Sequence, residues 1–164
     1  MGVLSTSLVI ARRALRVRPS GAVSTSDLRP LTCALIRAGL RYIAEERLLD
    51  SSNARGENLR SLLQHEVVRR FPQVYREVRG IGLLNGMEVT EQAAPAIAKL
   101  RTRLIENGVY VEFMAGAGRR SRGLRYIFPT MRVAPPLVTS NEDIVKIIEA
   151  IQSGTRTFVA EDLR

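Results

Sequence analysis

The stretch 131–138, Met-Arg-Val-Ala-Pro-Pro-Leu-Val, limits the fold more than any other part of the sequence. Its first three residues can pair as a short strand, and Pro135 and Pro136 then end it, because proline has no amide hydrogen to donate to a sheet. Ser140 with Asp143 three residues later is a capping-box pattern. The sequence therefore predicts a strand, a proline stop and a capped helix in immediate succession.

Hydrophobic residues at helical spacing predict four helices. Pro30 suits the first turn of one of them, where its missing amide hydrogen is no loss. The dipeptide Asn107-Gly108 is a helix-ending signal, and Pro72 stops another helix. The expected helices cover 30 to about 49, about 59–71, about 97–107, and the region after Ser140 with its isoleucine face at 144, 147, 148 and 151.

Three segments read as extended chain. The run 78–89 contains Gly80, Gly82 and Gly86, which suggest a bulge or close backbone approach, and 109–113 and 126–133 can supply further strands. Residues 7–11 could form a short buried strand, whereas 19–27 and the arginine-rich 114–127 read as loops. Helices on one side of a small, mostly antiparallel sheet follow from this order, which predicts an α+β fold.

Composition excludes several classes of site. Cys33 and His65 are each the sole residue of their type, so an internal disulfide, a cysteine metal site and a histidine-pair metal site are excluded. No apolar run approaches the ~20 residues of a membrane span. The net charge of +9 comes from arginines spread along the chain, without interleaved aromatic residues. We therefore expect no membrane insertion and no nucleic-acid binding.

Two motifs at this spacing resemble the class III pyridoxal-phosphate-dependent aminotransferases. They are Arg-x-Ala-Pro-Pro-Leu-Val at 132–138 and Arg-Gly-x-Gly-Leu-Leu-Asn at 79–85, and the ornithine aminotransferases are the most similar branch. The resemblance implies the small C-terminal domain of a fold-type I transferase. It also implies a homodimeric enzyme that uses pyridoxal 5'-phosphate to move an amino group from ornithine to a 2-oxo acid, giving glutamate semialdehyde and an amino acid.

Upstream residues extend the resemblance and suggest a domain division. Residues 2–11 resemble the family segment that follows its catalytic lysine, and 23–31 lie in register with a later family motif. We therefore expect 1–29 to be the end of the large cofactor domain with its connecting loop, 30–157 the small domain, and 158–164 a tail. An arginine- and serine-rich start without acidic residues also resembles a mitochondrial transit peptide.

The family's Schiff-base lysine would fall just before Met1 in this register. The sequence has 23 arginines and two lysines, and both Lys99 and Lys146 lie in predicted helices, where they read as surface residues. We therefore expect no catalytic residue in this chain and no activity of the chain alone.

Two regions could keep part of the family's binding function. By resemblance, Thr25 with Ser24 would contact the cofactor phosphate, and Arg132 would hold a carboxylate, either the substrate's or that of a large-domain glutamate. The alternatives are a loop threonine and a strand arginine that caps the sheet. Asp27 stands where the family has glycine, and a carboxylate near a phosphate argues against cofactor binding at this edge.

Other functions stay open. Acetylornithine and other ω-amino substrates are neighbouring specificities within the family. A different class of function is a non-catalytic module that keeps the small-domain fold and binds a partner. We expect amino acid and 2-oxo acid substrates and a homodimer from the resemblance, no metal, and a cytoplasmic or mitochondrial-matrix location rather than secretion.

Overall fold

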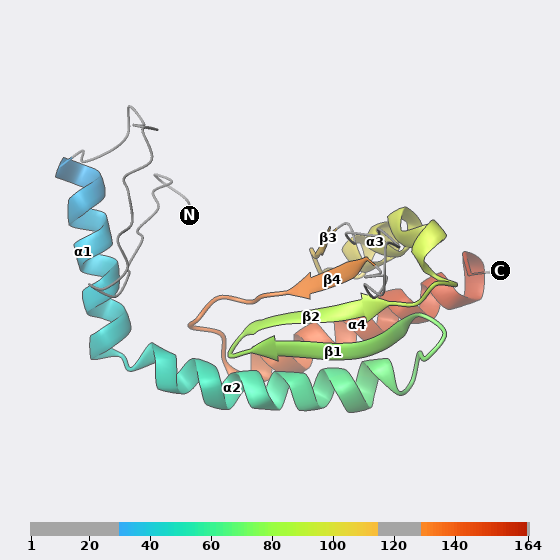
Figure 1. Ribbon diagram of the computed structural model, residues 1–164, viewed down its shortest axis with the longest axis horizontal. Helices are drawn as coiled ribbons and strands as arrows, with labels where there is room; N and C mark the ends of the chain where they lie inside the picture. Colours follow the sequence, from blue (N-terminus) through green and yellow to red (C-terminus); the bar gives the residue numbers. More distant parts are fainter. Residues whose placement is uncertain (1–29, 115–128, 164) are drawn as a thin grey trace, which may run out of the picture. The chain divides into compact units, whose positions relative to one another are not determined.

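The computed structural model describes residues 30–114 and 129–163 (Figure 1). These residues fall into two compact units, which divide between Arg47 and Leu48. The predicted strand at 7–11, the loop at 19–27 and nearly all of the loop at 114–127 lie outside the described residues. Among the described residues, no helix is long and apolar enough to cross a membrane.

The first unit contains the helix α1, Pro30–Glu45. It begins at Pro30 as predicted, but it ends before residue 49, so the predicted C-terminal bound was wrong. The reason lies in the backbone at Arg47, whose φ of 50° is left-handed and interrupts the helical hydrogen bonds. The predicted apolar face of this helix is exposed at Leu31 and Leu35.

The second unit begins with α2, Leu48–Leu62, which continues into a wider π-helical turn, η1, Leu63–Val68. The amide of Arg69 donates to the carbonyl oxygen of Gln64 at 3.1 Å, the five-residue spacing of that turn. The carbonyl oxygen of Glu66 accepts a hydrogen bond of 2.8 Å from the side-chain amide of Gln152. The turn thus joins this helix to the C-terminal helix.

Four strands form one antiparallel sheet in the order β1-β2-β4-β3 (Figure 1). The run predicted as one extended segment is a hairpin, because Gly82 with a φ of 51° turns the chain between its two strands. The third strand begins later than predicted, since the amide of Val109 still bonds to the end of the preceding helix. The strands are β1 Tyr75–Ile81, β2 Leu84–Val89, β3 Glu112–Met114 and β4 Thr130–Val133.

Two more helices complete this unit. A short 3-10 turn, η2, Ala94–Ala96, leads into α3, Ile97–Glu106, which ends at Asn107-Gly108 as predicted. The last helix is α4, Asn141–Glu161, and its predicted capping box is present: the Ser140 hydroxyl accepts from the Asp143 amide, and the Asp143 carboxylate accepts from the Ser140 amide. These two bonds satisfy donors that every helix start leaves unpaired.

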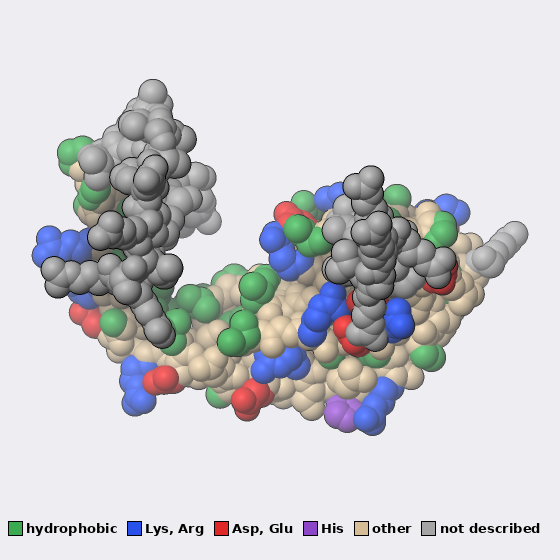
Figure 2. Space-filling view, in the orientation of Figure 1, with side chains coloured by type: hydrophobic (Ala, Val, Ile, Leu, Met, Phe, Trp, Pro, Cys, Tyr) green, Lys and Arg blue, Asp and Glu red, His purple; other side chains and the backbone are tan. Residues whose placement is uncertain are grey.

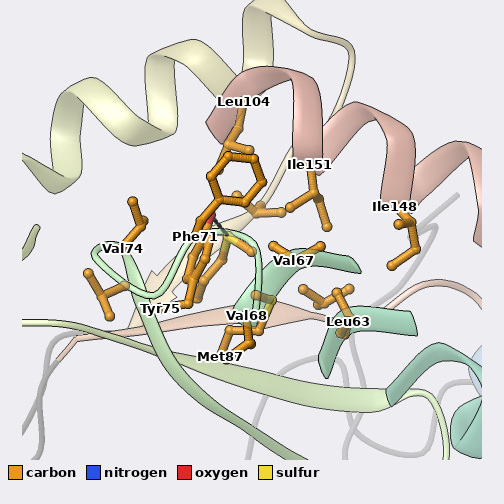
Figure 3. Packing of buried hydrophobic residues seen from close by; sticks show 14 of the residues in the cluster. Leu63, Val67, Val68, Phe71, Val74, Tyr75, Met87, Leu104, Ile148 and Ile151 are labelled. Carbon is orange, nitrogen blue, oxygen red and sulfur yellow. Dashed lines mark hydrogen bonds between the residues drawn. The ribbon is translucent and has the colours of Figure 1, made fainter. Parts of the chain in front are cut away.

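One face of the sheet is buried and carries the core. Met87 of β2 and Met131 of β4 are fully buried in one hydrophobic cluster with residues of η1, α3 and α4, and Figure 3 shows Met87 among them. The buried hydroxyl of Tyr75 bonds to Thr155 at 3.0 Å. Each large apolar side chain buried in this way contributes about 1.5–3 kcal/mol. The predicted isoleucine face of α4 is confirmed, with Ile144 and Ile151 fully buried. The predicted α+β fold with a small antiparallel sheet is confirmed.

The β1–β2 hairpin packs directly against α2. A Cβ atom at Gly56 would lie 2.1 Å from the carbonyl oxygen of Gly82, so the two backbones approach as closely as glycine allows. Arg60 donates to the same carbonyl oxygen at 3.0 Å, and the buried Asn85 donates to it at 3.2 Å. The Ser52 hydroxyl accepts a hydrogen bond from the amide of Leu83. These contacts fix the position of the turn and of both strands.

We predict that Gly56→Ala destabilises the second unit by about 2–3 kcal/mol, because the methyl group forces the hairpin away from α2. The free energy of unfolding in urea measures this effect. Gly39→Ala is the matched control: it lies in α1, and a Cβ there meets nothing within 4 Å. Equal stability of the Gly56→Ala protein and the wild type would show that the close approach does not hold the hairpin.

Arg103 on α3 joins the end of α4 to the rest of the unit. Its guanidinium pairs with Asp162 at 2.8 Å, with Glu161 at 2.7 Å and with Glu106 at 3.1 Å. The hydrogen bond from Arg103 holds the pKa of the Asp162 carboxyl below its ordinary value, and Lys99 adds to the effect. A carboxylate stabilised in the folded state in this way makes stability depend on pH.

Because the folded-state pKa of Asp162 is lowered, its stabilising contribution is present above the unfolded-state pKa of about 3.9 and is lost as the pH falls through the folded-state value. We therefore predict that Asp162→Asn lowers the stability at pH 7 and that the difference from wild type shrinks below about pH 4. Thermal unfolding from pH 2 to pH 7 checks this. A difference that stays constant over that range would contradict it.

Candidate functional site

The sheet face opposite the core carries charged side chains. In an antiparallel sheet, residues directly opposite one another point to the same face. Arg79, Gly86, Arg132 and Glu112 stand opposite one another on β1, β2, β4 and β3. They form a line across all four strands, which we call the arginine row, and Met131 on the neighbouring position of β4 points the other way into the core.

A second line of side chains runs beside the first on the same face. Glu77, Glu88, Thr130 and Met114 are its members, one from each strand. Charged side chains of both signs gather over the strands in the space-filling view, with hydrophobic side chains at the hairpin end (Figure 2). The open face thus presents paired charges beside an apolar edge.

Arg79 is held firmly by its neighbours. Its guanidinium pairs with Glu77 at 2.6 Å and with Glu88 at 3.0 Å, and it donates to the Thr130 hydroxyl at 3.2 Å. Only 12% of the Glu88 side chain is exposed, so this carboxylate is largely shielded from water. The contacts link β1, β2 and β4, and they give Arg79 a structural role in fixing the open face.

Arg132 is placed differently in the same row. It pairs through one terminal nitrogen with Glu112 on the edge strand β3. The two side chains are 45% and 47% exposed. Gly86 beside it brings no side chain, and a Cβ atom there would lie 2.8 Å from the Cγ2 atom of Thr130, so the Thr130 side chain covers this position. A guanidinium presents five N–H donors in a planar fork, a geometry that suits a carboxylate bound through two parallel hydrogen bonds.

The other predicted site residues are not brought to this face. Thr25 and Ser24 lie outside the described residues. Lys99 and Lys146 lie on α3 and α4, with side chains 64% and 75% exposed, and they pair with Asp162 and Asp143. These two helices pack on the opposite face of the sheet, so neither lysine can serve the arginine row.

The positions of these two lysines show whether this chain could attach the family's cofactor covalently. Pyridoxal phosphate needs a lysine whose amine is unprotonated and directed at the cofactor. Lys99 and Lys146 lie on helices on the opposite face of the sheet and are exposed to solvent rather than directed at the arginine row, so the described residues do not fit covalent attachment of the cofactor.

No metal centre is formed by the residues that the structure describes, since no three histidine, cysteine or acidic side chains come together. Cys33 is exposed on α1, and the Nδ1 atom of His65 contacts the carbonyl oxygen of Ser61 in its own helix. These positions give neither residue a catalytic partner.

Glu112 was not predicted as a site residue. It lies in the run 109–113, which was predicted as a strand, but nothing local identified its partner. Arg132 is 20 residues away in the sequence, across the segment 115–128, and only the pairing of β3 with β4 places the two side chains opposite each other.

Comparisons with known proteins agree with the motifs. The family model "Aminotransferase class-III" matches residues 2–154. An acetylornithine aminotransferase of Synechocystis sp. is 33% identical over 141 residues, which cover 86% of this chain and 30% of that protein. A mitochondrial ornithine aminotransferase of Oryza sativa subsp. japonica is 33% identical over 157 residues, which cover 91% of this chain and 30% of that protein.

Solved structures show the same fold. The ornithine aminotransferase of Toxoplasma gondii matches with a TM-score of 0.65 and 29% identity, over 88% of this chain and 31% of that one. The acetylornithine aminotransferase of Elizabethkingia anophelis matches with a TM-score of 0.66 over 87% of this chain and 34% of that one. The chain thus spans about a third of the length of these relatives, and it belongs to the class III aminotransferase family of pyridoxal-phosphate-dependent enzymes.

Proposed function

We propose that this chain serves a transaminase that acts on ornithine or acetylornithine, as the part that holds the substrate's carboxylate. The observation that carries the proposal is the guanidinium of Arg132, which projects from the open face of the sheet within the region matched by the family model. The two named relatives act on these two substrates by name, which supports the substrate class.

Arg132 would act by binding and orientation. A carboxylate paired with two of its nitrogens is fixed in direction as well as in distance, so the rest of the substrate points in one defined way. Lysine could not replace it on equal terms, because an ammonium group is a point charge without the planar fork. This binding role is one that the chain's own residues can perform.

The cofactor of the family supplies the electron sink for amino-group transfer when it is bound. Because Lys99 and Lys146 do not fit its attachment, we propose that the chain alone does not transaminate. A complete enzyme of this family would supply the lysine from other residues, with amino acid and 2-oxo acid substrates and a homodimeric assembly. The cofactor contacts of Thr25 and Ser24, the domain division at 29/30 and 157/158, and a cytoplasmic or mitochondrial-matrix location remain predictions.

The test of carboxylate binding uses glutarate and the full 164-residue chain. We predict that Arg132→Gln weakens glutarate binding by about tenfold or more, because hydrogen bonds to charged groups contribute about 1.5–3 kcal/mol. Isothermal titration calorimetry at low salt measures the dissociation constant. Arg101→Gln is the matched control, since it removes the same charge from α3, which packs on the other face of the sheet. Equal binding by the two variants would refute the role of Arg132.

The test of cofactor attachment uses borohydride reduction in the presence of pyridoxal phosphate at one equivalent. We expect no ornithine turnover, because neither Lys99 nor Lys146 lies on the face of the arginine row. Any cofactor trapped on these exposed amines should be substoichiometric, as for a free lysine. Peptide mass spectrometry and a coupled transaminase assay read the two results. Turnover together with a trapped adduct on either lysine would overturn the proposal.

A further inference from the structure

We infer that Glu112 sets the carboxylate affinity of this site, because it occupies Arg132 as an internal competitor. The inference rests on the proposed function, in which Arg132 binds the substrate's carboxylate. It names a residue within this chain that a ligand must displace, and it makes β3 part of the binding site rather than only the edge of the sheet.

The register of the sheet brings the two side chains together. Glu112 and Arg132 are directly opposite on β3 and β4, where opposite charges attract across an antiparallel pair. The contact uses the NH2 nitrogen of Arg132 and the Oε2 oxygen of Glu112. Among the described residues, the other guanidinium nitrogens of Arg132 have no partner, so the pair is held at one point rather than two.

A carboxylate that contacts a guanidinium through one nitrogen is easier to displace than one that contacts it through two. An incoming carboxylate can bind two guanidinium nitrogens in parallel, whereas Glu112 contacts one. Both side chains are nearly half exposed, so water already screens their attraction. Exchange of partners therefore costs little, yet the internal carboxylate still lowers the net affinity for any ligand.

Arg79, on the same face of the sheet, is held by more contacts than Arg132. It is shared between two carboxylates and a hydroxyl, and one of those carboxylates is largely shielded from water. A ligand would have to break several contacts to recruit it. Within the arginine row, Arg132 is thus the guanidinium that can change partner, and Glu112 is the residue that governs the change.

The experiment measures glutarate binding by the full chain and its variants at 150 mM salt. We predict that Glu112→Gln tightens binding about two- to fivefold, the range expected when an exposed ion pair no longer competes. The amide keeps the size of the side chain, and amide NMR spectra would verify that the sheet is unchanged. Glu77→Gln is the matched control, because it removes the same charge from the same face beside Arg79, and it should leave binding unchanged.

The double variant Glu112→Gln/Arg132→Gln separates this inference from the proposed function. If the gain acts through Arg132, the double variant binds no better than Arg132→Gln alone. Unchanged binding in Glu112→Gln, an equal gain in Glu77→Gln, or a gain that persists in the double variant would each overturn the inference. Loss of binding in Arg132→Gln without any gain in Glu112→Gln would keep the proposed function and remove only the role of Glu112.

Discussion

Burial of a single face of a four-stranded sheet is the constraint on which the site depends. Side chains alternate along a strand, so fixing Met87 and Met131 in the core fixes Gly86 and Arg132 on the open face. A shift of one residue in register would exchange the two sets and place a guanidinium against the hydrophobic core. The core under η1, α3 and α4 thus selects which residues can meet a ligand.

The packing of the β1–β2 hairpin against α2 fixes the position of the strands and so the register of the sheet. Gly56 lets the backbone of α2 reach the turn at Gly82, and Arg60 and Asn85 converge on its carbonyl oxygen. From there β2 sets the register of β4, and β4 sets that of β3. The distance between Arg132 and Glu112 is therefore determined by contacts on the far side of the sheet, and residues remote from the ligand contribute to its geometry.

Local signals allowed much of this fold to be predicted from the sequence. The capping box at Ser140, the helix end at Asn107-Gly108 and the isoleucine face of α4 each depend on residues a few positions apart, and the structure confirms all three. The break at Arg47 carried no glycine or proline to mark it. The turn at Gly82 was harder to predict, because the run 78–89 contains three glycines and any of them could mark a turn or a bulge.

The residues of the candidate site also fall into those that could be predicted from the sequence and those that could not. Arg132 was predicted as a site residue because a sequence motif surrounds it, whereas Arg79 belongs to the other motif and was not predicted as a site residue. Glu112 could not be predicted, since its partner is set by the pairing of β3 with β4, 20 residues away in the sequence. Glu88 meets Arg79 nine residues away because β1 and β2 form a hairpin, which was not predicted. A short edge strand such as β3 has little hydrophobic pattern of its own, so its register is determined by the sheet.

A crystal structure of the full chain with glutarate would test the assignment of Arg132 most directly. We expect one carboxylate of glutarate to lie on Arg132 with two parallel hydrogen bonds, and the side chain of Glu112 to have turned away. Glutarate bound elsewhere, with Arg132 still paired to Glu112, would contradict the assignment of the open face as the carboxylate site.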